Sequence, residues 1–186
     1  MIHKGGRTLL SESQKEMRGA FLGGFAGQLI SGLIWLLASG ISVLAKPQYG
    51  MAVLFFGSMS IFPLTQLILF MIGRKPKVNK DNGLWPLGAQ IAFIVPINFL
   101  LVGGISIYRP MWFFPAAMIV VGSHYLPFMT LYGMKIFGVL ATLLISLGTY
   151  LALYGPQIFS LGGWITGILL IIFAFIGKYS VLQEEK

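Results

Sequence analysis

Few residues of this chain could do chemistry inside a membrane, and most of them are neutral. Among the polar side chains within the long apolar runs, six stand out: Gln28, Gln66, Gln90, Asn98, His124 and Tyr125. Amides and hydroxyls donate and accept hydrogen bonds without carrying charge at neutral pH. His124 is the only histidine in an apolar run, and an ionisable residue within a membrane indicates a functional site. These six residues form the predicted polar pocket.

Carboxylates are absent from the apolar runs. The acidic residues all lie outside them: Glu12, Glu16, Asp81, Glu184 and Glu185. Proton-coupled carriers commonly depend on a carboxylate within the membrane, and metal sites need clustered acids, histidines or cysteines. The chain has no cysteine and two histidines, His3 and His124. We therefore expect no metal site, no cofactor site and no catalytic site.

Polar residues of five apolar runs fall at similar depths. A rise of 1.5 Å per residue gives depths of about 9 to 14 Å from the cytoplasmic end for Gln28, Gln66, Gln90, His124 with Tyr125, and Thr142. Asn98 lies deeper, at about 21 Å. These groups could line a hydrated pocket open to the cytoplasm, or they could only hydrogen-bond helix to helix. Both interpretations place the side chains toward the interior.

The composition determines which elements must position these residues. Of the 186 residues, 56% are hydrophobic and 10% charged, and the mean hydropathy is +0.84. A soluble domain carries about 25% charged residues, so the composition predicts an all-α integral membrane protein. Six runs are long enough to span a bilayer: 20–45, 49–73, 84–107, 111–132, 136–154 and 158–179. The short turn between the fourth and fifth runs leaves five spans with a re-entrant element as an alternative.

One six-helix transmembrane domain is expected over residues 20–180, after a cytoplasmic segment 1–19 and before a cytoplasmic tail 181–186. The first run exceeds the length of a signal-peptide core, so we interpret it as a permanent span. Ser13 and Glu16 have the spacing of a capping box. Residues 1–19 could therefore form a short helix or a solvated tail.

The cations indicate the orientation. With the N-terminus in the cytoplasm, 11 of the 13 Lys and Arg residues lie on the cytoplasmic side, as expected for bacterial inner-membrane proteins. Only Lys46 and Arg109 lie outside. Both termini are predicted to be cytoplasmic, and the formal charge of +8 indicates topology rather than nucleic-acid binding. Arg109 could attract an anion at an outer vestibule, or it could be an interfacial arginine.

Prolines and glycines suggest how the helices bend and pack. Pro110, Pro115 and Pro127 punctuate the fourth run, so we expect a broken fourth helix. Two pairs have the spacing GxxxG, which lets helices approach closely: Gly23 with Gly27, and Gly163 with Gly167. They could seal the fold or form a homo-oligomer.

The fourth run also carries a resemblance. The stretches WFFPAAM (112–118), GSHYLPF (122–128) and LYGM (131–134) resemble a block of small bacterial multi-span membrane proteins. That family is catalogued only as a domain of unknown function. The resemblance implies a bacterial inner-membrane protein and draws attention to His124 and Tyr125. It implies no activity, substrate or cofactor.

Three classes of function remain. The first is a channel or carrier for a small neutral or weakly charged solute, with its site in the polar pocket. The second is an accessory or immunity-type protein that binds another membrane component. The third is an intramembrane enzyme with His124 as base beside Tyr125 or Ser123, although a histidine without an orienting acid is a poor general base.

Overall fold

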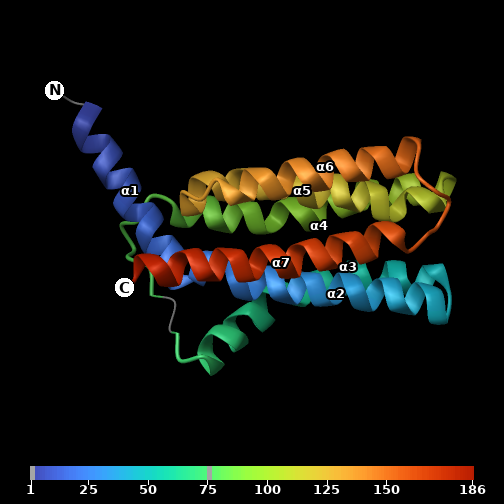
Figure 1. Ribbon diagram of the computed structural model, residues 1–186, viewed down its shortest axis with the longest axis horizontal. Helices are drawn as coiled ribbons and strands as arrows, with labels where there is room; N and C mark the ends of the chain where they lie inside the picture. Colours follow the sequence, from blue (N-terminus) through green and yellow to red (C-terminus); the bar gives the residue numbers. More distant parts are fainter. Residues whose placement is uncertain (1–2, 75–76) are drawn as a thin grey trace.

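The computed structural model describes residues 3–74 and 77–186, with side chains from residue 9 onward, and its regular elements are helices (Figure 1). Seven α-helices and two short 3₁₀ helices follow one another along the chain: α1 (His3–Ala20), η1 (Leu22–Gly24), α2 (Phe25–Leu44), α3 (Pro47–Met71), α4 (Trp85–Tyr108), η2 (Pro110–Trp112), α5 (Phe113–Tyr132), α6 (Ile136–Leu153) and α7 (Leu161–Glu184).

Six of these helices are long and apolar enough to cross a membrane, which confirms the predicted six-helix membrane protein. The five-span alternative is wrong, because α5 and α6 are separate helices. Gly133 ends α5 with a left-handed backbone (φ 65°), and α6 begins at Ile136. A glycine adopts this conformation without steric cost, and it commonly terminates helices in this way.

The N-terminal segment forms a helix, so the solvated-tail alternative is wrong. Ser13 and Glu16 lie in the middle of α1 rather than at its start, and therefore make no capping box. Leu22, Gly23 and Gly24 all have positive φ between α1 and α2. These three residues turn the chain sharply, and α1 projects away from the bundle (Figure 1). Gly23 consequently lies in a turn and forms no helical GxxxG with Gly27.

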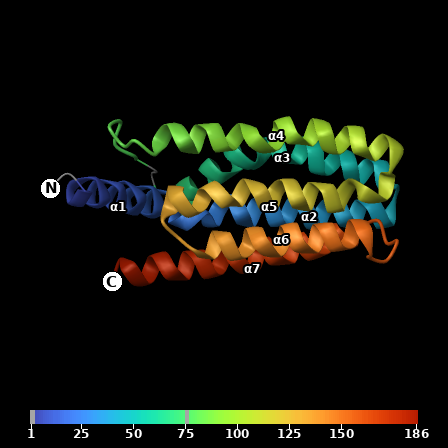
Figure 2. The same cartoon turned by 90° about the horizontal axis from the view of Figure 1, so that it is seen from above.

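The spanning helices pack in two layers (Figures 1 and 2). One layer holds α2, α3 and α7, with α2 in extensive contact with both neighbours; the other holds α4, α5 and α6, centred on α5. In the first half of the chain (α2, α3 and α4), α2 pairs with α3, and in the second half (α5, α6 and α7), α5 pairs with α6. The third helix of each half packs on the first helix of the other half: α4 on α5, and α7 on α2. Since α2 and α5 run in opposite directions (Figure 1), the two halves form an inverted pair.

Glycines allow the closest helix contacts within the chain. A Cβ on Gly32 in α2 would lie 2.9 Å from the carbonyl oxygen of Gly167 in α7, and the converse distance is also 2.9 Å. Gly163 lies against Ser39 and Phe114, and Gly27 faces Thr65 of α3. The second predicted pair and Gly27 therefore contact helices of the same chain, which is the sealing role expected for small residues.

Prolines affect the helices unequally. The structure does not confirm the predicted break in the fourth helix: α5 continues through Pro127, and Pro110 belongs to η2, which precedes it. Pro63 lies inside α3, and the C-terminal part of α3 turns away from the other helices (Figure 1). A proline inside a helix removes one hydrogen bond and is the usual cause of such a kink.

Candidate functional site

Gln28 of α2 and Tyr125 of α5 form the centre of the candidate site, where the two layers meet. Both are buried, with 4% and 5% of their surfaces exposed. The Gln28 amide lies beside the Tyr125 hydroxyl. Its Oε1 is nevertheless buried without a hydrogen-bond partner among the described residues. A buried acceptor of this kind is costly, and it can accept a hydrogen bond from a bound molecule.

Aromatic rings hold Tyr125 in place. Its ring stacks on Phe137 of α6, with the centroids 6.0 Å apart and an interplanar angle of 14°. Phe128, one turn further along α5, contacts the rings of both Tyr125 and His124, with centroid distances of 5.5 and 5.0 Å. Rings at these separations pack favourably. These ring contacts hold the Tyr125 side chain in place, with its hydroxyl toward α2.

His124 faces α4 rather than α2. Its imidazole lies next to the backbone carbonyl of Ile91 in α4, and its Nδ1 is the second buried polar atom without a partner in the described part of the chain. Ser123 donates its hydroxyl to the Val120 carbonyl oxygen at 2.8 Å. In this part of the chain Ser123 makes no hydrogen bond with His124, so the serine–histidine arrangement that the enzyme hypothesis needs is not formed.

Among the described residues, the other predicted pocket residues make no hydrogen bond to Gln28, Tyr125 or His124. Asn98 donates to the Ile94 carbonyl oxygen of its own helix at 2.8 Å. Gln66 is half-buried and Gln90 is exposed. The structure thus brings together Gln28 and Tyr125, with His124 adjacent on α5. Arg109, predicted at an outer vestibule, is exposed after the end of α4.

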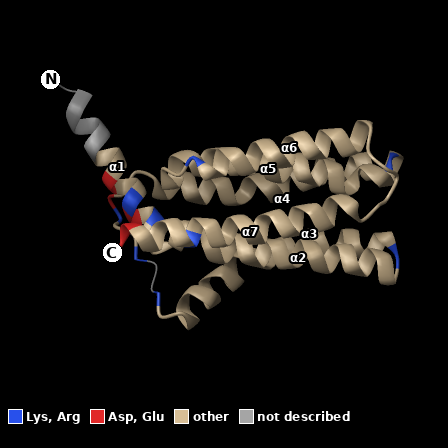
Figure 3. Cartoon of the chain, viewed as in Figure 1, with Lys and Arg blue, Asp and Glu red and all other residues tan. Residues whose placement is uncertain are grey.

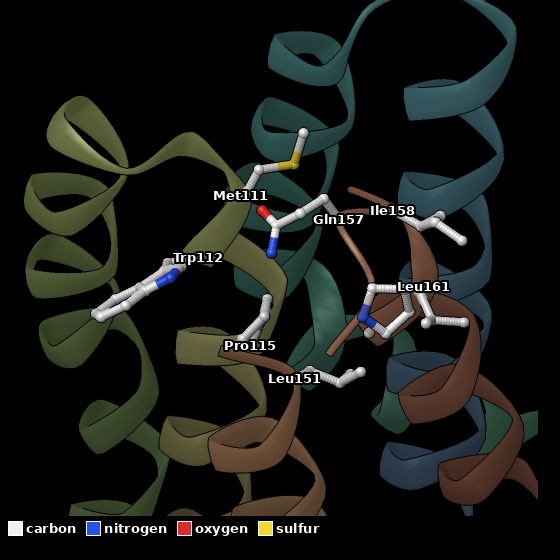
Figure 4. Close-up of a pocket in the computed structure, with 9 residues that line it drawn as sticks. Met111, Trp112, Pro115, Leu151, Gln157, Ile158 and Leu161 are labelled. Carbon is white, nitrogen blue, oxygen red and sulfur yellow. The ribbon is translucent and has the colours of Figure 1, made fainter. Parts of the chain in front are cut away.

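Two cavities lie away from these residues, in the half of the bundle where α3 and α5 begin. The first, of about 10 Å³, is large enough for about one water molecule, and Gln157 reaches it beside Pro115 and Met111 (Figure 4). The second is a groove of about 380 Å³ between α3 and α4. None of the predicted pocket residues lines either cavity.

A polar cluster that sequence reasoning missed lies at the end of the bundle where α1 meets the end of α7, which we call the charged end (Figure 3). Arg18 of α1 pairs with Glu184 at 2.7 Å. It also donates to the Tyr132 carbonyl oxygen at 2.5 Å, so one guanidinium joins α1 to the ends of α5 and α7. A guanidinium suits this role because it offers several donors in a fixed plane.

A second ion pair at the charged end is bidentate. Arg74, after α3, donates to both carboxylate oxygens of Glu185 at 2.8 and 2.6 Å. These hydrogen bonds favour the ionised carboxylate, so they lower the pKa of Glu185, and they raise the pKa of Arg74. The pair fixes the end of α3 to the end of α7.

Glu16 connects α1 to the segment before α4. Its Oε1 accepts the Asn79 backbone N–H at 2.6 Å, and its Oε2 accepts the Asn82 side-chain amide, also at 2.6 Å. The side-chain Oδ1 of Asn82 in turn accepts the Leu84 N–H at 2.9 Å, immediately before α4. The sequence signal was present, since the spacing of Ser13 and Glu16 drew attention to Glu16, but its partners are distant in the chain.

Most of the chain is similar to a known protein family. Residues 10–178 match a family model described as "Family of unknown function (DUF7010)". This confirms the resemblance to a family catalogued only as a domain of unknown function, over far more of the chain than residues 112–134. No curated protein and no solved structure match.

Proposed function

Because the chain belongs to this family of unknown function, from which no activity can be transferred, we propose a function from geometry: the protein is a carrier for a small neutral or weakly charged solute. The solute binds between the two layers at Gln28 and Tyr125, next to His124, which follows Ser123 on α5 and faces α4. We further propose that it acts in a bacterial inner membrane with both termini in the cytoplasm.

The observation that carries this proposal is that two buried atoms, Gln28 Oε1 and His124 Nδ1, have no hydrogen-bond partner in the described part of the chain. A buried polar group without a partner costs about 1–3 kcal/mol. A solute with N–H or O–H groups would recover that cost at Gln28 Oε1, and the Tyr125 hydroxyl could bind it from the opposite layer. Among the described residues, no carboxylate lies deeper in a spanning helix than Glu184, the last residue of α7, which pairs with Arg18. A neutral solute therefore fits this site better than a cation.

The inverted arrangement supports a carrier rather than a fixed pore. In transporters with inverted repeats, the substrate site lies between the halves, and one group of helices rocks against the other. Gln28 and Tyr125 lie on α2 and α5, the first helix of each half. The ion pairs of the charged end would then hold one side of the protein closed.

An accessory or immunity-type protein is the second candidate. It is favoured by the position of the two described cavities, neither of which reaches the site. In this role the protein would bind another membrane component through its lipid-facing surfaces.

Proteoliposomes distinguish the two candidates. Light scattering after mixing would measure the entry of urea, acetamide and glycerol into vesicles with and without the protein. A carrier gives rates above protein-free vesicles that saturate with solute concentration. Gln28→Leu should abolish this flux for a transported solute, while Gln157→Leu, the same change at an exposed site, should retain it. Rates equal to those of protein-free vesicles for all three solutes would contradict the proposal and favour the accessory role.

A further inference from the structure

A groove opens sideways between α3 and α4, in the half of the bundle away from the charged end. Its volume is about 380 Å³, and its lining is apolar except for Ser106. The Ser106 hydroxyl donates to the Val102 carbonyl oxygen of its own helix at 2.6 Å, so this donor is already used. The groove therefore offers a ligand almost purely apolar contact.

The groove exists because α3 and α4 belong to different layers and share few contacts. Phe99 and Phe113 line it and are buried, with 2% and 4% exposed. Phe55 of α3 also lines it, and its ring packs against that of Phe99, with the centroids 6.4 Å apart. Gly103 keeps the α4 side open: a Cβ at this position would meet no atom within 4 Å.

Two cations flank the end of the groove nearest the membrane surface. Lys46 immediately precedes α3 and Arg109 immediately follows α4; both side chains are exposed. Every acidic residue lies at the charged end, so neither cation has a carboxylate nearby in the part of the chain that the structure describes (Figure 3). This end therefore attracts an anion of the membrane surface.

We propose that the groove binds one anionic phospholipid, with an acyl chain between α3 and α4 and the phosphate near Lys46 and Arg109. Between Phe99 and Ile107 the groove is about 12 Å long, so its volume corresponds to a cross-section of about 30 Å². A helix of about 10 Å diameter needs about 80 Å². The groove is therefore wide enough for a lipid chain but too narrow for a whole helix to enter.

Native mass spectrometry of the purified protein with added phosphatidylglycerol tests the chain site. Gly103→Leu fills the groove, and should lower the fraction of protein that retains one lipid by about tenfold, as expected for losing contact with a few methylene groups. Gly104→Leu is the matched control, because a Cβ there also meets no atom within 4 Å but Gly104 does not line the groove. Leucine is the better helix former, so both variants should fold. Equal lipid retention by the two variants would overturn the proposal.

The headgroup site needs its own comparison, between phosphatidylglycerol and the zwitterionic phosphatidylcholine. The unmodified protein should retain phosphatidylglycerol preferentially. Lys46→Gln combined with Arg109→Gln should remove this preference, while Lys135→Gln combined with Lys186→Gln, which removes two exposed cations at the charged end, should preserve it. Equal retention of both lipids by the unmodified protein, or the same loss in the control double variant, would contradict the assigned headgroup site.

Discussion

Gln28 shows how a single residue can be costly for folding and useful for binding. Its side chain is buried and its Oε1 lacks a partner among the described residues. Replacing an unsatisfied buried polar group by an apolar group of similar shape is commonly neutral or stabilising. Residues retained despite such a cost are typical of functional sites.

Gln28→Leu should therefore leave the free energy of unfolding unchanged or raise it by about 1 kcal/mol, while abolishing solute transport. Thermal unfolding in detergent, followed by circular dichroism, measures the first effect. Gln28→Ala is the comparison, since it removes the same amide but leaves a void, and should destabilise the protein by about 2 kcal/mol or more. If Leu destabilised as strongly as Ala, the Gln28 amide would have a structural role that the geometry does not indicate.

Glu185 is a single residue that makes the free energy of unfolding depend on pH. Its hydrogen bonds with Arg74 lower the pKa in the folded protein below the ordinary value of 4.5. The unfolded state therefore takes up a proton first as pH falls, so the stabilisation is present above pH 4.5 and is lost at lower pH. Because both side chains are about one-third exposed, we expect less than about 1 kcal/mol.

Unfolding midpoints measured between pH 7 and pH 3 would test this. Glu185→Gln should reduce the decrease in stability at acidic pH, whereas Glu12→Gln, at an exposed position of α1, should leave the decrease as in the unmodified protein. Identical pH profiles for Glu185→Gln and the unmodified protein would show that the Arg74 pair contributes nothing.

At the scale of elements, α1 is the part that the sequence predicted least well. Its polar residues indicated a helix or a tail, but its partners come from distant segments. Thr130 accepts a hydrogen bond from Gln14, Glu184 pairs with Arg18, and Asn82 donates to Glu16. These contacts join residues more than 60 positions apart, and no local pattern encodes them. The spanning helices were predictable because their length and apolarity follow from bilayer thickness.

Glu16→Ala should loosen the segment that leads into α4. The Asn79 N–H and the Asn82 amide lose their shared acceptor, so this segment should open more often while the spanning helices stay protected. Hydrogen exchange of the amides of residues 79–84 measures this opening. Glu12→Ala, an exposed position of the same helix, is the control, and equal exchange in both variants would show that Glu16 does not hold this segment.

The polar pocket shows why the positions of its residues in the fold could be predicted only in part. Depth along each helix follows from residue number, so Gln28 and Tyr125 could be predicted to lie at similar depths in the membrane. The direction in which each side chain points depends on helix rotation and packing, so Gln90 proved exposed and Asn98 bonded to its own helix. Pro127 was also misleading, because a proline can lie within a continuous membrane helix when its neighbours stabilise it.

For the whole molecule, charge is distributed very unequally. Among the described residues, the carboxylates and most cations lie at one end of the bundle (Figure 3). Lys46, before α3, and Arg109, after α4, lie at the other end. The excess of Lys and Arg marks the cytoplasmic side of membrane proteins. The charged end, with its ion pairs and α1, should therefore face the cytoplasm, and the end with the lipid groove should face outward.

The absence of cysteine from the chain makes this orientation directly testable with single-cysteine variants. Gln48→Cys, at an exposed position near the start of α3, should react with a membrane-impermeant maleimide in intact cells stripped of their outer membrane. Lys135→Cys, exposed between α5 and α6 at the charged end, should react only after the membrane is permeabilised. The reverse pattern would invert the orientation: the ion-paired end would then face outward and the groove would take lipid from the cytoplasmic leaflet. Because the two positions are separated by the length of the helices, one labelling experiment decides from which leaflet the lipid enters and from which side the solute site is closed.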